Sequence, residues 1–309
     1  MTGSVAASPG LASRLINGLL TVRPLANLLK QQARAMMIKR AESIGVQWTQ
    51  DAQALRDRGL ETWNSELQQI QDPHLIYPDY YLKPFHAYET GNLSWDAATE
   101  VEVAAYAVHA QIWSKDGAKD GDAQLRNSFQ TLLKQHIVPD PTRILDLGCS
   151  VGMSTVALQS AYPNADVTGL DLSPYFLTVA QYQHRQAQRP IQWVHAAAEQ
   201  TPFADGSFDL VSTFLMCHEL PQSATRSMLR EARRLLRSGG HLTLMDMNPR
   251  AEVFAKLPPY VFTLLKSTEP YLDEYFTLDL EAAFISEGFE APLVFRNSPR
   301  HRTLIAQVR

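Results

Sequence analysis

The residues best suited to chemistry lie in the stretch RILDLGCSVGMST at 143–155. Its first part reads as a buried strand that carries Asp146, and a helical pattern follows the stretch. Between them, Gly148 and Gly152 form a turn where a bound cofactor can approach the backbone without meeting a Cβ atom. Asp171 follows Gly148 by 23 residues and ends the next expected strand, where a carboxylate can accept hydrogen bonds from both hydroxyls of a ribose. This pattern, a strand, a glycine turn and a helix followed by the acid, predicts a binding site for a nucleotide-type cofactor.

The turn lacks the spacing of a dinucleotide-binding loop. That fingerprint, GxGxxG, uses three glycines to bring a pyrophosphate to a helix N-terminus. Here Ser150 stands at the second glycine position, and Met153 and Ser154 follow Gly152. The turn therefore disfavours a dehydrogenase. It suits a cofactor with adenosine and an amino acid but no phosphate, which indicates S-adenosylmethionine.

A parallel sheet must position these residues. After Pro141, short apolar runs alternate with helical patterns, as in βαβ units. We expect strands at 143–148, 166–171, 191–196, 208–214 and 241–247. The last runs, APLVFRN and RTLIAQVR, are joined by a short turn and should pair antiparallel. The predicted fold class is α/β: a doubly wound, Rossmann-like, mostly parallel sheet with an antiparallel C-terminal strand pair and a helical N-terminal domain.

The first 124 residues read as a separate helical unit. Apolar residues recur there at helical spacing, as in TEVEVAAYAVHAQIWS at 99–114, and no strand-like alternation appears. We therefore divide the chain into a helical cap or lid domain, residues 1–124, and an S-adenosylmethionine-binding domain, residues 125–309.

An aromatic stretch of the cap, YPDYYLKPFHAYETGNLSW at 77–95, has two interpretations. It can be core, with Phe85 and at least half of the tyrosines buried. Its two prolines interrupt helices, so we favour a lid that closes over the cofactor. Tyr81, His86 and Tyr88 are then candidate substrate residues, because tyrosine rings can face a sulfonium and polar tips can contact an acceptor.

Four motifs occur in a characteristic order: DLGCSVG, GLDLSP, AAAEQTPFADGSFDLV and LLRSGGHLTLMD. Together they resemble the class I S-adenosylmethionine-dependent methyltransferases, in particular the branch similar to the ubiquinone/menaquinone-type methyltransferases. The resemblance covers residues 143–309. It implies that the first motif holds the methionine part of the cofactor and that the acid of the second strand holds the ribose. The cofactor-binding residues that we predict are Asp146, Gly148, Ser150, Gly152, Asp171, Leu172, Ala198, Glu199 and Phe214.

One motif departs from the family pattern. The family often has an Asp-Ala-Glu triplet after the third strand, whose Asp meets the adenine amino group, whereas this chain reads Ala197-Ala198-Glu199. The resemblance then implies that adenine recognition rests on the backbone near Ala198 or on Glu199.

Methyl transfer from a sulfonium needs alignment, exclusion of water and sometimes removal of a proton, so it has no universal catalytic signature. Ligands bind at the carboxyl ends of parallel strands, which favours FLMCHELP after the fourth strand. His218 is the predicted catalytic residue, a general base with an ordinary pKa of about 6.5. Its alternative is a structural role in the loop. Glu219 is a substrate-side candidate or a helix start, and His195 is expected to be buried and hydrogen bonded.

Composition limits the partners. The chain has 309 residues, a net charge of −4 and two cysteines without metal-ligand spacing, so we expect neither nucleic acid nor a metal site. No apolar run reaches the roughly 20 residues that span a bilayer, and a cytoplasmic location fits. Residues 1–50 hold six basic side chains and one acid, with apolar positions such as Leu11, Leu15 and Leu19 at helical spacing. We favour packing of these helices on the protein over a peripheral membrane contact.

The sequence thus predicts an S-adenosylmethionine-dependent methyltransferase. Its acceptor would be a small molecule, lipophilic or aromatic, methylated on oxygen or carbon. The basic N-terminal helices slightly favour a lipophilic acceptor reached from a membrane surface. The alternative is a non-catalytic module with a methyltransferase fold, which binds S-adenosylmethionine or a partner protein. The departure at Ala197 is the observation that favours this alternative.

Overall fold

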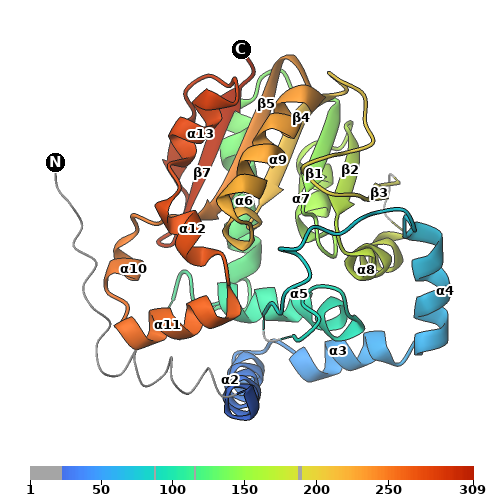
Figure 1. The fold of residues 1–309 in the computed structure, drawn as a ribbon, viewed down its shortest axis with the longest axis vertical. Coiled ribbons are helices and arrows are strands. Elements are labelled where there is room, and N and C mark those ends of the chain that lie inside the picture. The colour runs from blue at the N-terminus through green and yellow to red at the C-terminus, as the bar shows by residue number, and fades with distance from the viewer. Residues whose placement is uncertain (1–22, 87, 115, 187–189) are drawn as a thin grey trace.

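The computed structural model describes residues 23–86, 88–114, 116–186 and 190–309 (Figure 1). Its centre is one seven-stranded sheet with the order β3-β2-β1-β4-β5-β7-β6. The strands are β1 (Arg143–Leu147), β2 (Asp166–Asp171), β3 (Gln192–His195), β4 (Phe208–Phe214), β5 (Leu236–Met247), β6 (Leu293–Arg296) and β7 (His301–Gln307). The first five are parallel, and β7 lies antiparallel between β5 and β6. The predicted fold class is confirmed.

One strand is longer than expected. β5 begins at Leu236 rather than at His241, because the glycine-containing segment before His241 continues the strand. Phe208 pairs with Leu236, and the register shifts before Leu210 pairs with His241. Glycine in this segment tolerates the irregular backbone that such a shift requires.

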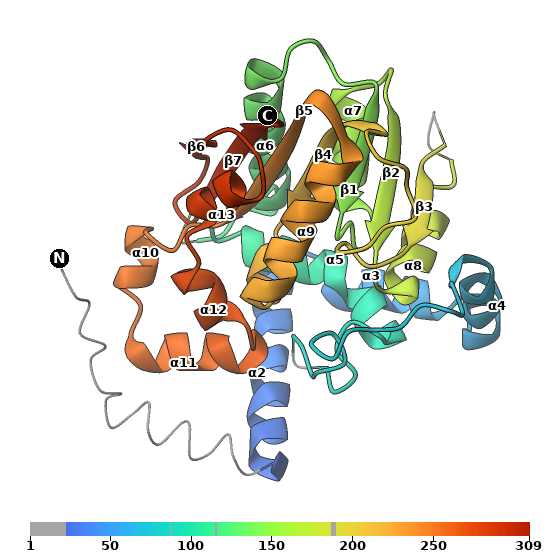
Figure 2. The same ribbon diagram turned by 45° about the horizontal axis from the view of Figure 1, so that its top comes forward.

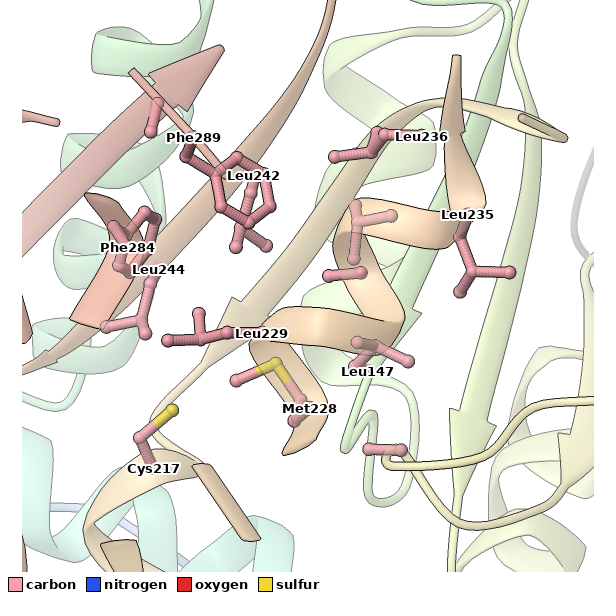
Figure 3. Close-up of a cluster of buried hydrophobic side chains, with 14 of the residues drawn as sticks. Leu147, Cys217, Met228, Leu229, Leu235, Leu236, Leu242, Leu244, Phe284 and Phe289 are labelled. Carbon is pink, nitrogen blue, oxygen red and sulfur yellow. The ribbon is translucent and has the colours of Figure 1, made fainter. Parts of the chain in front are cut away.

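Helices cover both faces of the sheet, so the strands alternate between two apolar cores. One core lies under α6 (Gly121–His136) and α7 (Met153–Ala161) and includes Phe129 and Ile144. The other lies under α9 (Gln222–Leu235) and α13 (Leu280–Ser286). Figure 3 shows part of the second core, where Met228 and Leu229 of α9 point toward the strands.

Two groups of helices lie at the carboxyl edge of the parallel strands, below the sheet in Figure 1. The first precedes the sheet and comprises α2 (Arg23–Ser43), α3 (Trp48–Arg56), α4 (Leu60–Ile70) and α5 (Trp95–His109). The second is an insertion after β5 and comprises α10 (Glu252–Ala255), α11 (Pro259–Thr268) and α12 (Leu272–Thr277). Figure 2 shows both groups on the same side of the sheet, with α8 (Pro174–His184) beside α4. The sequence did not predict the second group.

The described residues test only part of the expectations for the N-terminal region. The apolar positions Leu11, Leu15 and Leu19 lie outside the described residues. Because α6 begins at Gly121, a boundary between residues 124 and 125 falls inside this helix, and the division into two domains stays a prediction. Within the described ranges, no helix is both long and apolar enough to cross a membrane.

A buried carboxylate joins the helices of the cap. Glu100 of α5 is 0% exposed. It accepts hydrogen bonds from Arg34 of α2, from Arg56 of α3 and, at 2.7 Å, from the hydroxyl of Tyr88. Such donors replace the water that a buried carboxylate loses. Glu100 therefore connects three helices with the aromatic stretch 77–95.

We expect Glu100→Ala to lower the free energy of unfolding by about 2–3 kcal/mol, because two partly exposed arginines lose their shared partner. Urea unfolding monitored by circular dichroism measures the change. Asp96→Ala, one turn earlier, removes a side chain that is 75% exposed and 3.5 Å from Arg56. It should lower stability by less than about 0.5 kcal/mol. Equal effects of the two substitutions would contradict the role of Glu100.

Candidate active site

The turn between β1 and α7 has a left-handed backbone at three positions. The φ angle is +68° at Gly148, +51° at Ser150 and +86° at Gly152. A Cβ atom at Gly148 would clash with Met216, and one at Gly152 would lie 2.5 Å from the ring of Trp193. Backbone conformation and neighbouring side chains therefore require these glycines, in addition to any approach of a cofactor.

Asp171 holds this turn in place. Ser150 adopts the left-handed conformation despite its side chain, at a cost of about 1–2 kcal/mol. Its N–H donates to Oδ2 of Asp171 at 2.7 Å, and the N–H of Ser173 donates to Oδ1 at 2.8 Å. Burial raises the pKa of Asp171 to about 6, although the backbone hydrogen bonds lower it. The lone pairs that remain on the carboxylate can accept ribose hydroxyls.

Asp146, on β1, is fully buried. Its Oδ2 atom accepts hydrogen bonds from the hydroxyls of Ser154 and Thr155 at the start of α7, both at 2.7 Å. Oδ1 and the hydroxyl of Ser150 are buried, and no described residue forms a hydrogen bond with them. An ammonium group has the donors that such atoms need. The residues present therefore fit the methionine end of S-adenosylmethionine.

The residues expected near the adenine lie against the aromatic stretch 77–95. The hydroxyl of Tyr80 donates to Glu199, and burial, followed by the charge of Glu199, raises the pKa of Tyr80. Ala198 and Leu172 are each 8% exposed. The stretch therefore covers the carboxyl ends of β2 and β3.

His195 is buried and hydrogen bonded, as expected. Its Nδ1 accepts from the N–H of Asp72 at 2.9 Å, which places the ring proton on Nε2. Nε2 lies 3.2 Å from both the carbonyl of Leu172 and the hydroxyl of Tyr77. Burial lowers the pKa of His195, so the neutral ring joins the cap to the sheet.

Phe214 and Tyr88 make structural contacts. Phe214, expected beside the cofactor, packs its ring 5.5 Å from that of Phe129, in the core under α6. Successive strand residues point to opposite faces, and Phe214 points to this face. Tyr88, expected to face the substrate, donates its hydroxyl to Glu100. The site roles of both residues stay predictions.

His218 forms a buried pair with a carboxylate. It lies in η1 (Cys217–Glu219), directly after β4, and its Nδ1 is 2.7 Å from Oδ1 of Asp246 on β5. Burial lowers the pKa of His218, but the charge and hydrogen bond of Asp246 outweigh it and raise this pKa to about 10. The ring therefore holds a proton at neutral pH. It can donate a hydrogen bond through Nε2 more readily than it can act as a base.

Side chains from three segments meet next to this pair. His86, from the stretch 77–95, places Nε2 at 2.9 Å from Oε1 of Glu269, at the end of α11, and at 3.8 Å from Oε1 of Glu219. Burial raises the pKa of Glu219, although the charge of His86 lowers it. Burial also raises the pKa of Tyr81, and the charge of Glu219 contributes to this shift. The structure thus brings three of the four predicted substrate residues together and separates Tyr88 from them.

Sequence reasoning did not assign Asp246 or Glu269 to the site, and it did not distinguish Tyr80 from the other tyrosines of its stretch. Asp246 follows the apolar run HLTLM much as Asp146 follows RIL, so an acid within a buried strand is the signal that identifies it. Glu269 lies in the insertion that the sequence did not reveal. Tyr80 is one of several similar tyrosines, and only the fold distinguishes its contact with Glu199.

Comparison with known proteins agrees with this site. Residues 144–240 match a family model described as a methyltransferase domain. A malonyl-[acyl-carrier protein] O-methyltransferase from Legionella pneumophila is 31% identical over 165 residues, which are 52% of this chain and 54% of that protein. A ubiquinone/menaquinone biosynthesis C-methyltransferase from Desulfotalea psychrophila is 30% identical over 146 residues, which are 47% of this chain and 56% of that protein. The chain thus spans about half the length of these two relatives.

The fold also matches a solved structure of a candidate O-methyltransferase from Nostoc punctiforme. The TM-score is 0.53 at 18% identity, and the match covers 81% of this chain and 68% of the other. At this identity the likeness shows the fold alone. The domain match and the curated relatives show that residues 144–240 are similar to a methyltransferase domain, and S-adenosyl-L-methionine is the cofactor that fits this similarity.

Proposed function

We propose that this protein transfers the methyl group of S-adenosylmethionine to a small, lipophilic or aromatic molecule, on oxygen or carbon. This proposal rests on the contact between two segments that lie over the carboxyl edge of the sheet. The N–H of His86 donates to the carbonyl of Thr268 at 3.1 Å, and the rings of Tyr80 and Tyr271 are 6.2 Å apart. The aromatic stretch and the insertion therefore contact each other beside His218. A site covered by two such segments would suit a small acceptor and would exclude water.

The surroundings of the site and the similar proteins support the acceptor class. Tyr80 lies with its ring edge toward both Tyr81 and Tyr271, and such rings favour an apolar or aromatic ligand. The names of the two relatives specify an O-methyltransferase and a C-methyltransferase. We include both kinds of transfer for this reason.

The residues of the chain have distinct roles in the proposed reaction. S-adenosylmethionine, when bound, supplies a methyl group on a sulfonium leaving group. Asp171 holds the ribose, and Asp146 holds the ammonium group. Asp246 orients the ring of His218, whose Nε2–H donates to an oxygen of the acceptor. The proton that the acceptor loses on methylation passes to the carboxylate of Glu219, whose pKa burial raises to about 7. Alignment of donor and acceptor can supply about 7–11 kcal/mol of the barrier.

Calorimetric titration with S-adenosylhomocysteine tests cofactor binding. Transfer of a tritiated methyl group to phenols, quinols, fatty acids and a crude lipid extract tests the acceptor class. We expect binding and a labelled product that extracts into organic solvent. Binding without a labelled product would favour the non-catalytic module, and no binding by folded protein would contradict the proposal.

His218→Asn should lower kcat by about 100-fold, because it removes the Nε2 donor. The asparagine amide keeps an N–H near the position of Nδ1, so the bond to Asp246 persists. We therefore expect the Kd of S-adenosylhomocysteine to change by less than about threefold. The control His136→Asn alters an exposed histidine at the end of α6 and should leave kcat unchanged. A matching loss of cofactor affinity in His218→Asn would indicate a structural role instead.

A further inference from the structure

One buried carboxylate oxygen of the insertion has no partner in the described part of the chain. The side chain of Glu269 is 8% exposed, and its Oε1 lies 2.9 Å from Nε2 of His86. Oε2 is buried, and no described residue donates a hydrogen bond to it. A buried carboxylate oxygen without a hydrogen bond is energetically unfavourable. Oε2 of Glu269 therefore suits a ligand that supplies a hydrogen-bond donor.

A second buried atom of the same cluster points to a ligand. The hydroxyl of Tyr81 is buried and has no hydrogen-bond partner among the described residues. Burial, then the charges of Asp171 and Glu219, raise the pKa of Tyr81, and the charge of Glu269 contributes to the raised pKa of Glu219. A carboxylate oxygen that accepts, together with a tyrosine hydroxyl that can donate, matches the hydrogen-bonding capacity of an alcohol or a phenol.

Each histidine of the cluster is paired with a carboxylate. Asp246 is paired with His218, and Glu269 is paired with His86. Burial lowers the pKa of His86, but the charge and hydrogen bond of Glu269 raise it above its ordinary value. The contact with His86 occupies Oε1 of Glu269 and leaves Oε2 free to accept a hydrogen bond from a ligand.

We propose that Oε2 of Glu269 accepts a hydrogen bond from a hydroxyl group of the methyl acceptor, which is therefore a phenol or an alcohol. This inference rests on the proposed methyltransferase function. It assigns a binding role to the end of α11, which is far in sequence from the cofactor turn. The insertion after β5 then selects the acceptor as well as enclosing it.

Phenol and anisole are matched probes, because only phenol carries a hydrogen-bond donor. The experiment uses the full chain saturated with S-adenosylhomocysteine and measures probe binding by ligand-detected NMR. We expect saturable binding of phenol and at least about tenfold weaker binding of anisole. Equal binding of the two probes, or no binding of phenol, overturns the proposal. This comparison needs no variant and holds even if a substitution prevents folding.

Glu269→Gln then tests the residue itself. The amide oxygen can keep the contact with His86 and leave an NH₂ group, which cannot accept, toward the ligand. Phenol should bind at least about tenfold more weakly, with the affinity for S-adenosylhomocysteine unchanged within about threefold. The control Glu252→Gln removes a 73% exposed carboxylate of the same insertion, paired with Lys256, and should change neither affinity.

The two proposals fail in different ways. If the wild-type protein is folded but does not bind S-adenosylhomocysteine, the proposed function is wrong. If S-adenosylhomocysteine binds and phenol binds equally well to Glu269→Gln, only the hydroxyl subsite is wrong.

Discussion

Asp171→Ala should weaken the binding of S-adenosylhomocysteine by at least about 100-fold. The substitution removes the acceptor for the two ribose hydroxyls, and a hydrogen bond to a charged group contributes about 1.5–3 kcal/mol. It also removes the carboxylate that accepts from the N–H groups of Ser150 and Ser173. The left-handed conformation of Ser150 then has no anchor, and the turn loses its shape. Calorimetric titration at pH 7.5 measures the affinity.

The control for this result is Asp205→Ala. Its carboxylate forms a surface pair with Arg234, and its side chain is 81% exposed, so the affinity should not change. The pH dependence of the wild type gives a second check. Because the pKa of Asp171 is raised to about 6, affinity should fall as the pH drops through 6 and the carboxylate gains a proton. Unchanged affinity in Asp171→Ala would refute its ribose role.

Asp246→Asn should lower the free energy of unfolding by about 3–5 kcal/mol below pH 6.5, because it leaves the imidazolium of His218 buried without its counter-charge. The side chains of His218 and Asp246 are 7% and 0% exposed, so solvent screens the pair very little. In the variant, burial still lowers the pKa of the ring, and only the charges of Glu269 and Glu219 remain to raise it. Chemical denaturation across a pH series measures the difference from the wild type.

The sign of the pH dependence follows from linkage. In the unfolded chain His218 titrates near 6.5, whereas in the folded protein its pKa is raised to about 10. The contribution of the pair is therefore fully present below pH 6.5 and is lost as the pH rises to about 10. The stability difference between wild type and Asp246→Asn should shrink over this window. If the stability difference between the two proteins is the same at every pH, Asp246 does not raise the pKa of His218.

The cofactor side of the protein could be predicted from the sequence to a large extent. The strand, glycine turn and helix around Gly148 occupy one short stretch, and the elements on either side determine their geometry. The face to which Phe214 points was not predictable, because a strand residue can point to either face and only the packing of α6 determines which face is core. The strands themselves are indicated by local apolar patterns that alternate with helices.

The acceptor side could not be predicted in the same way. His86, Glu219 and Glu269 come from three distant segments, and their contacts depend on how the cap and the insertion pack on the sheet. A single histidine or glutamate in a loop carries no periodicity that would reveal its partners. Tyr88 shows the reverse case, since its type and position suggested a site residue and Glu100 engages its hydroxyl.

The sequence by itself determined the fold class, the cofactor and the turn that receives it, because these depend on residues close together along the chain. Only the tertiary structure decided which carboxylate accompanies His218, how tightly the ring holds its proton and which side chains lie beside it. Those properties depend on burial and on charges brought together from distant segments. The stretch from Tyr77 to Trp95 is the clearest example, because its neighbours determine that Tyr80 meets Glu199, His86 meets Glu269 and Tyr88 meets Glu100.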